Sequence, residues 1–184
     1  KGDWLIIEAD ESDGSVVQYH PEIGLLLNVD KDHQEIDELM DLFGQFKKNT
    51  TGLFVVNQNN KYSKQLSTDA NQDFGFENNK SGYNATNFVQ DGFQLSFQLR
   101  NQVFKMNAIG QYSVENATAA VAVLHQIGID LETCAKSLEN YEGIYRRQQI
   151  LGNKNGVWVI DDYAHNPAKC AASIRACQPL SNKV

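Results

Sequence analysis

The sequence is short of positive charge and of long apolar runs, and each shortage excludes a class of protein. The chain has 16 Lys and Arg against 23 Asp and Glu, a net charge of -7. Because these cations do not gather into the basic face that a nucleic-acid backbone requires, we expect no nucleic-acid partner. No apolar run approaches the roughly 20 residues of a membrane span, so we expect no membrane partner.

Cysteine is also scarce, which argues against a disulfide framework or a cysteine metal site. Cys134, Cys170 and Cys177 are an odd number without CxxC spacing. We expect reduced core residues and a cytoplasmic protein. The chain opens at Lys1, just before a predicted strand, and stops at Val184 soon after a predicted helix begins. This is typical of a part of a longer protein.

What the sequence does contain is an α/β pattern in its first third. Apolar residues recur three and four apart over 34–49, which predicts an amphipathic helix. Apolar runs predict strands at 3–8, 23–29 and 54–57. The second run is continuous enough to be buried on both faces, as in a parallel sheet.

The middle third changes character after residue 57. Asparagines punctuate a polar region that predicts loops and short strands. Strict alternation over 93–99 then predicts a half-exposed strand, which pairs with 103–106 in a hairpin.

Helices are predicted next, and then a second domain. Ser113 is a good N-cap for a helix to Ile127 that Gly128 closes, and Asp130 begins another to about Tyr141. Residues 143–152 predict a connection that divides the chain into domains 1–143 and 144–184. A strand at 157–160 and a helix from Pro167 follow it.

Three predicted strands run into polar residues that are capable of chemistry. These ends are Glu8 with Asp10, Glu11 and Asp13; Asn28 with Asp32 and His33; and Asp161 to Pro167. Ligands of parallel sheets gather beyond the carboxyl ends of the strands. The four acids that begin at Glu8 either cap local amides in a solvated loop or face a cation. Together, the three ends favour Mg²⁺ or Mn²⁺ with oxygen ligands and one imidazole.

Five motifs in the chain resemble those of the Mur ligases in order and spacing. They are Glu8-Ala9-Asp10-Glu11-Ser12-Asp13, Asn28-x-x-x-Asp32-His33, Gly110-x-x-x-x-x-Asn116-Ala117-x-Ala119-Ala120, Gly143-x-x-Arg146-Arg147 and Asp161-Asp162-Tyr163-Ala164-His165-x-Pro167. Within that family the chain is most similar to the members that join L-alanine, or a recycled murein tripeptide, to UDP-N-acetylmuramate.

The resemblance implies an ATP-dependent amide-bond ligase of cytoplasmic peptidoglycan synthesis, with ATP and Mg²⁺ as cofactors. ATP phosphorylates the muramyl carboxylate, the amine attacks the acyl phosphate, and phosphate leaves. For phosphoryl transfer the protein mainly positions the reactants and neutralises the negative charge of the phosphates. The implied fold is α/β: a P-loop-type ATPase domain with a mostly parallel central sheet and an antiparallel extension, followed by the start of a Rossmann-like domain.

The resemblance also assigns roles to residues by position. Glu8 and His33 match the Mg²⁺ ligands, and with Arg147, which matches the arginine near the phosphates, they are the candidate catalytic residues. Asn116 matches the adenine contact and Asp162 the ribose contact. The candidate substrate-binding residues are Asp10, Glu11, Ser12, Tyr163, His165 and Asn166. For Arg146 and Arg147 an ion pair with Glu139 or Glu142 is the alternative.

The chain departs from the family pattern in three places. No G-x-x-x-x-G-K-[ST] occurs in the 184 residues, so we expect that this polypeptide alone does not ligate. Tyr112 and Ser113 replace a His-Asn pair, and the loop after His33 is shorter than usual in the alanine enzymes. A non-catalytic module that binds a nucleotide or a partner is therefore one alternative, and a metal-dependent phosphohydrolase is another.

Overall fold

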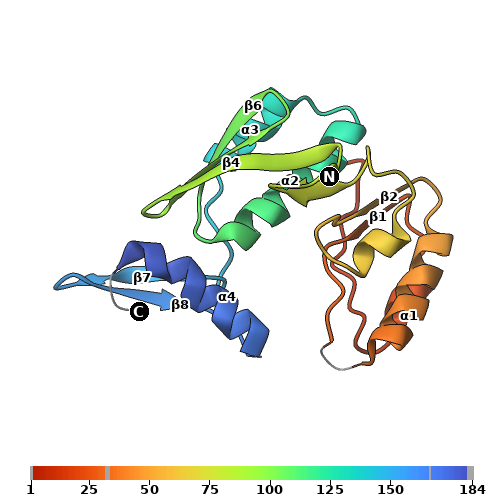
Figure 1. Cartoon of the computed structure of the whole chain (residues 1–184), viewed down its shortest axis with the longest axis horizontal. Coiled ribbons are helices and arrows are strands. Elements are labelled where there is room, and N and C mark those ends of the chain that lie inside the picture. Colours follow the sequence, from red (N-terminus) through yellow and green to blue (C-terminus); the bar gives the residue numbers. More distant parts are fainter. Residues whose placement is uncertain (1, 32–33, 166, 182–184) are drawn as a thin grey trace.

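The computed structural model describes residues 2–31, 34–165 and 167–181, which form an α/β fold of three small sheets and four α-helices (Figure 1). A parallel pair, β1 (Ile23–Leu26) and β2 (Leu53–Val56), is connected by α1 (Ile36–Asn49). The helix predicted over 34–49 and the strand predicted over 54–57 are thus confirmed. Short 3-10 turns lie at η1 (Ser15–Gln18), η2 (Ser63–Leu66) and η3 (Gln178–Leu180).

Local sequence explains where α1 begins and ends. Glu35 and Glu38 form a capping box in which each side chain accepts a hydrogen bond from the other residue's backbone N–H. Lys47 and Lys48 in the last turn complement the negative end of the helix dipole. The helix buries Phe43 and its apolar neighbours against β1 and β2, so the parallel pair has its own small core.

Two predictions about the first strands were wrong. Residues 3–8 form no strand, and Leu5 and Ile6 are 83% and 89% exposed. A strand needs a hydrogen-bonded neighbour, and within the described part of the chain β1 pairs with β2 alone. β1 is also shorter than the predicted 23–29, and this run is not buried on both faces, because the side chains of Leu25 in β1 and Leu27 just after it are exposed.

A second, mixed sheet holds four strands in chain order. Its strands are β3 (Phe74–Phe76), β4 (Tyr83–Asp91), β5 (Gln94–Leu99) and β6 (Gln102–Asn107). β3 and β4 are parallel, whereas β4, β5 and β6 are antiparallel, so the predicted 93–106 hairpin is confirmed. The asparagine-rich region does contain loops, but β4 is longer than the short strands predicted there. A parallel bridge between Asn57 and Phe74 links β2 to this sheet.

Asparagine side chains take the place of strand partners between β2 and β3. Asn59 Oδ1 accepts from the Phe76 N–H at 2.7 Å, and Asn59 Nδ2 donates to Phe76 O at 2.9 Å. Asn60 Nδ2 donates to Val29 O at 3.2 Å, beyond the end of β1. The asparagines that marked this region as irregular therefore satisfy its backbone groups.

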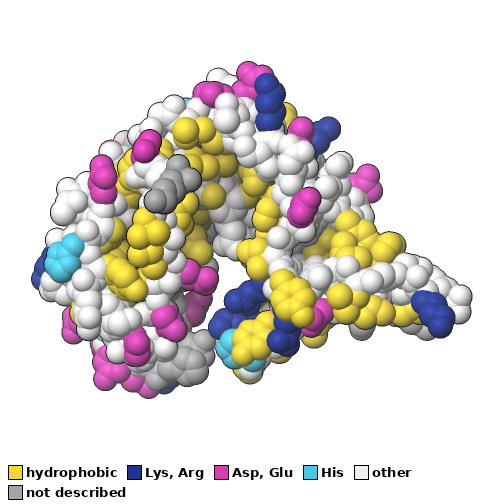
Figure 2. Space-filling model, turned by 180° about the vertical axis from the view of Figure 1, so that it is seen from behind, with side chains coloured by type: hydrophobic (Ala, Val, Ile, Leu, Met, Phe, Trp, Pro, Cys, Tyr) yellow, Lys and Arg dark blue, Asp and Glu magenta, His cyan; other side chains and the backbone are white. Residues whose placement is uncertain are grey.

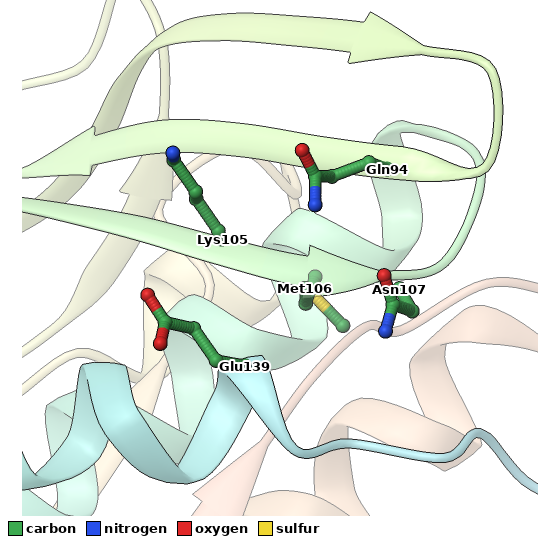
Figure 3. A pocket seen from close by; sticks show the side chains of 5 residues that line it. All are labelled: Gln94, Lys105, Met106, Asn107 and Glu139. Carbon is green, nitrogen blue, oxygen red and sulfur yellow. The ribbon is translucent and has the colours of Figure 1, made fainter.

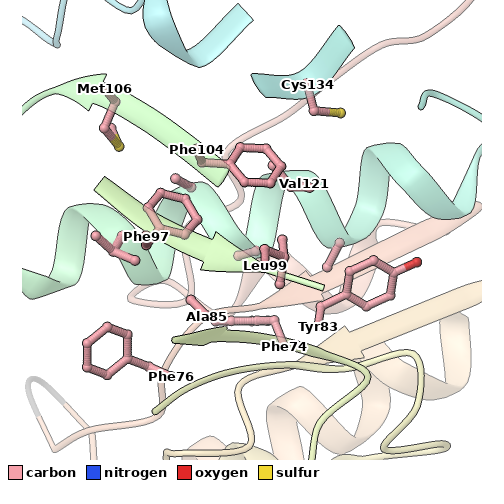
Figure 4. Close-up of a cluster of buried hydrophobic side chains, with 14 of the residues drawn as sticks. Phe74, Phe76, Tyr83, Ala85, Phe97, Leu99, Phe104, Met106, Val121 and Cys134 are labelled. Carbon is pink, nitrogen blue, oxygen red and sulfur yellow. The ribbon is translucent and has the colours of Figure 1, made fainter. Parts of the chain in front are cut away.

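Helices α2 (Gln111–Gln126) and α3 (Leu131–Glu139) cover the mixed sheet and form the main core with it (Figure 4). Phe97 and Phe104 stack at its centre with ring centroids 5.3 Å apart. Ala119 and Ala122 are completely buried, which lets α2 approach the sheet closely. All three cysteines are free thiols, as predicted, but only Cys134 is a core residue, because Cys170 and Cys177 are partly exposed.

The predicted cap of α3 is confirmed, whereas that of α2 was wrong. The Asp130 carboxylate accepts from the Thr133 N–H at 2.8 Å. α2 begins directly after Gly110, which has φ +81°, and the Ser113 hydroxyl instead donates to Ile109 O at 2.7 Å. Glycine adopts positive φ without steric cost, so the chain turns into the helix earlier than the serine suggested. Gly128, with φ +98°, follows the other end as expected.

The C-terminal part is a hairpin and a helix. β7 (Gln149–Lys154) and β8 (Val157–Asp161) are antiparallel, and α4 spans Pro167–Cys177. The strand at 157–160 and the helix from Pro167 are confirmed, but β7 occupies part of the predicted 143–152 connection. Asn155 and Gly156, both at positive φ, make the two-residue turn that this hairpin needs. No helix among the described residues is long and apolar enough to cross a membrane.

Candidate active site

The acidic segment is a loop, and two of its carboxylates serve neighbouring backbone amides. Asp10 Oδ1 accepts from the Ser12 N–H at 2.8 Å, and Asp13 Oδ1 accepts from the Ser15 N–H at 2.8 Å. The hydrogen bonds from Ser15 lower the pKa of Asp13 below its ordinary value. Local capping, one of the explanations that the sequence left open, is thus observed at both side chains.

The same segment lines an open cavity of about 410 Å³. Its walls are Glu8, Ala9, Asp10 and Glu11, and Glu8 is exposed. Ala9 packs against the apolar cluster to which Val29, just beyond β1, also belongs. The cavity therefore lies beside the parallel pair, even though the segment does not end a strand.

Gln34 connects this acidic segment to the loop that follows β1. Its Nε2 donates to Glu11 O at 3.2 Å and to Ser12 O at 3.3 Å. His33, the residue before it, lies outside the described residues, as does Asp32, so the pairing of Glu8 with His33 stays a prediction. The structure does bring together the two loops that the sequence assigned to one site. Gln34 had been noted only as part of a shortened loop, because a contact so distant in sequence leaves no local pattern.

The chemistry of this cavity suits a hard cation. Among the residues that the structure describes, no three His, Cys, Asp or Glu side chains gather into a metal cluster. Mg²⁺, however, usually takes only one or two protein carboxylates, with phosphate oxygens and waters as its other ligands. The exposed Glu8 carboxylate at the cavity wall fits that partial role.

Asp162 is held firmly at the end of β8. Its Oδ2 accepts from the Gln148 N–H at 3.1 Å, and its Oδ1 accepts from the Ala164 N–H at 2.7 Å. A carboxylate oxygen has two lone pairs, so each can accept a further hydrogen bond from a ligand hydroxyl. Gln148 is buried and had not been singled out, because its role depends on a contact across the hairpin.

The two neighbouring arginines differ in their surroundings. Arg146 Nε lies 3.6 Å from Asp161 Oδ2, so its partner is neither Glu139 nor Glu142. Both groups are partly exposed, and such an ion pair contributes little stability. Arg147 is exposed and makes no ion pair within the described residues, so its guanidinium is available to an anionic ligand.

Tyr163 and His165 form a small exposed cluster with Arg146. The Tyr163 ring centroid lies 5.1 Å from the Arg146 guanidinium carbon and 5.4 Å from the His165 ring centroid. His165 Nδ1 is 3.1 Å from Tyr163 O. Asn166, also predicted here, lies outside the described residues.

Asn116 is exposed on α2, and a neighbouring side chain of this helix lies close to Asp162. Burial raises the pKa of Tyr112 strongly, and the negative charge of Asp162 raises it further. That electrostatic effect requires the phenol and the carboxylate to be near each other. The start of α2 and the end of β8 thus face one region, as the predicted adenine and ribose contacts would require.

A hollow separates the N-terminal part from the C-terminal hairpin and helix. Figure 2 shows acidic side chains on one of its walls and Lys, Arg and His side chains on the opposite wall. Walls of opposite charge can hold a cation on one side and phosphate groups on the other.

A second open depression, of about 210 Å³, lies away from these residues. Figure 3 shows it between the β5–β6 hairpin and the end of α3, lined by Gln94, Lys105, Met106, Asn107 and Glu139. None of these residues belongs to the predicted catalytic, cofactor or substrate-binding set, and we assign no role to the depression.

The sequence matches the family model of the Mur ligase middle domain over residues 1–124. The chain belongs to the Mur ligase family. A UDP-N-acetylmuramate–L-alanine ligase of Endomicrobium trichonymphae is 31% identical to this Mur ligase chain, over 96% of the chain and 42% of that protein. The enzyme of the same name from Nostoc punctiforme is also 31% identical, over 95% of the chain and 38% of that protein. The chain therefore spans about two fifths of the length of these relatives.

Solved structures show the same fold. UDP-N-acetylmuramate-alanine ligase from Thermotoga maritima superimposes with a TM-score of 0.81 at 22% identity, covering 95% of this Mur ligase chain and 42% of that one. A UDP-N-acetylmuramoylalanyl-D-glutamyl-2,6-diaminopimelate–D-alanyl-D-alanyl ligase from Acinetobacter baumannii gives 0.75 at 24% identity, covering 94% and 40%. The predicted α/β fold class is confirmed.

Proposed function

We propose that the protein is an ATP-dependent amide-bond ligase that joins L-alanine to UDP-N-acetylmuramate in the cytoplasmic synthesis of peptidoglycan precursors. One observation carries the proposal: relatives that bear this name are 31% identical over nearly the whole chain, well beyond the middle domain. The charged hollow and the positions of Asp162 and Arg147 support it. In this proposal residues 1–143 form the ATP-binding domain and 144–184 begin the substrate domain.

The side chains have distinct roles in this reaction. Asn116 contacts adenine, Asp162 accepts from the ribose hydroxyls, and the Arg147 guanidinium binds phosphate oxygens. Glu8 and His33 hold Mg²⁺, which neutralises the charge of the phosphates when it is bound. Asp10, Glu11, Ser12, Tyr163, His165 and Asn166 border the muramyl substrate and its incoming amine.

The proposal is tested by assaying the complete gene product with ATP, Mg²⁺ and UDP-N-acetylmuramate. We expect phosphate release that depends on L-alanine and a product heavier by one alanyl residue in mass spectrometry. Turnover with the murein tripeptide in place of alanine would show that the enzyme is instead the ligase that uses the recycled tripeptide. If neither amine releases phosphate, the chain is better explained as a non-catalytic module.

Asp162→Asn tests the ribose contact. The amide can accept one of the two N–H bonds but lacks the charge, so we expect the KM for ATP to rise about tenfold, the value of a charge-assisted hydrogen bond. Asp41→Asn, on the exposed face of α1, is the matched control and should leave KM unchanged. Equal KM values in the two variants would refute the assignment.

We further propose that the 184-residue polypeptide does not ligate by itself. It contains no G-x-x-x-x-G-K-[ST] loop, whose backbone amides and lysine hold ATP phosphates in enzymes of this kind. Any ATP- and alanine-dependent product formed by this polypeptide alone would contradict the proposal.

A further inference from the structure

Gln90 joins two parts of the molecule that are far apart in sequence. It lies in β4, where its Oε1 accepts from the Gly110 N–H at 3.0 Å. Its Nε2 donates to Ala176 O at 3.2 Å and to Gly92 O at 3.3 Å. One amide group thus binds the residue before α2 at one end and the last turn of α4 at the other.

Gly110 and Ala176, the two residues that Gln90 joins, are also packed directly against each other. Gly110 and Ala176 are both buried, and a Cβ added at Gly110 would lie only 2.6 Å from Ala176 Cβ. Gly110 also needs its positive φ to start α2. The start of α2 and the end of α4 are therefore in direct contact, and Gln90 lies beside that contact.

An aromatic pair lies at the same junction. Phe93, in the turn between β4 and β5, meets Trp158 of β8 edge to face, with ring centroids 4.6 Å apart. Figure 1 shows this hairpin extending toward the β7–β8 hairpin. The pair and the Gln90 amide are separate contacts that hold the C-terminal unit (β7, β8 and α4) against the β4–β5 hairpin.

We infer that Gln90 is a positioning residue that fixes the C-terminal unit against the start of α2 and so sets the spacing between Asn116 and Asp162. The inference rests on the proposed function, since it takes these two side chains as contacts of one nucleotide. α2 carries Asn116, and the C-terminal unit carries Asp162. A glutamine reaches both because its amide donates at one end and accepts at the other.

The test compares three variants of the complete gene product. Gln90→Leu removes all three side-chain hydrogen bonds with little change in volume, whereas Gln90→Glu keeps the acceptor for Gly110 and loses the donor to Ala176 and Gly92. Gln94→Leu, exposed on the adjacent strand of the same hairpin, is the control. For each we would measure hydrogen exchange in the segments that contain Gly110 and Ala176, and the KM for ATP and kcat.

For Gln90→Leu we expect faster exchange at Gly110 and a KM for ATP raised about three- to tenfold, the factor of about one net hydrogen bond, with a smaller change in kcat. Gln90→Glu should keep the Gly110 protection and give an intermediate KM. The inference is overturned if Gln90→Leu matches Gln94→Leu in exchange and in KM. If the wild type does not use ATP, the proposed function fails, and with it the role in nucleotide spacing. Faster exchange would then still support the structural part of the inference, that Gln90 fixes the C-terminal unit against the start of α2.

Discussion

The mixed sheet and the β7–β8 hairpin are both rich in apolar residues, yet only the sheet has a core. Along β5 every second residue is buried completely or nearly so, beneath α2 and α3. Along β8 the consecutive residues Val157, Trp158 and Val159 are all substantially exposed. The difference lies in what covers the strands, because an apolar side chain stabilises a fold only when another layer removes it from water.

The same contrast holds for the N-terminal segment. Leu5 and Ile6 are as apolar as any residue of β5, but no described strand pairs with them and no helix covers them. Apolar sequence alone is therefore a poor guide to stability in this protein. Substitutions in covered and uncovered strands should separate the effect of apolar composition from the effect of burial.

The largest expected effect is at the centre of the covered sheet. Phe97→Ala removes a stacked, buried ring and should lower the free energy of unfolding by about 3–5 kcal/mol. Val157→Ala in the exposed hairpin should change it by less than about 0.5 kcal/mol. Urea unfolding of both variants measures the difference, and comparable losses would show that the hairpin is covered in solution.

The next largest effect is expected at a buried acidic residue, because the contribution of a polar side chain to stability also depends on its burial. Asp73 is completely buried and accepts from the Val56 N–H at 2.9 Å, from Gln58 Nε2 at 2.6 Å and from the Ser67 hydroxyl at 2.5 Å. Asp73→Ala leaves the buried Val56 N–H without its acceptor, which should cost about 1–3 kcal/mol.

The matched control for Asp73 is Asp91→Ala, at the exposed tip of the β4–β5 hairpin. It should be close to neutral in the same urea titration. A loss at Asp91 equal to that at Asp73 would mean that burial does not decide the cost.

The smallest expected effect concerns pH and a half-buried acid on the covering helix α2. Burial raises the pKa of Glu115, although Gln111, which donates to its carboxylate at 2.7 Å, lowers it. The folded state thus holds this proton more tightly than the unfolded state. The resulting stabilisation is present below the ordinary pKa of 4.5 and is lost as pH rises through the folded pKa.

Glu115→Gln should therefore be slightly more stable than the wild type at pH 7, with the gap narrowing toward pH 4. Thermal unfolding across this range measures the gap, and Glu142→Gln, at an exposed position, is the control. A gap that widens on acidification would have the wrong sign for a pKa raised by burial.

Much of the fold was predictable because local rules governed it. The 3.6-residue period gave α1, strict alternation gave the β5–β6 hairpin, and Asp130 gave the start of α3. The rules failed where a distant partner decided the outcome. Among the described residues no strand pairs with 3–8. A local cause also intervened at α2, which begins after Gly110 rather than at Ser113 because the φ of Gly110 is positive.

The sequence indicated which loops form the candidate site, but not which hydrogen bonds connect them. Gln34 does connect the acidic segment to the loop of His33, and Asp162 is presented by the predicted strand. No motif marks Gln34, or the Gln148 backbone N–H that binds Asp162, because each bonds to a residue far away in sequence. Arg146 likewise pairs with Asp161, across the hairpin rather than within the linker.

The asparagine side chains between β2 and β3 have a consequence for how this protein could work. Amides neither gain nor lose a proton across the range in which proteins fold. Asn59 and Asn60 therefore keep the same bonds to Phe76 and Val29 whatever the acidity around them. The segment that joins β2 to β3 is therefore held in place independently of pH.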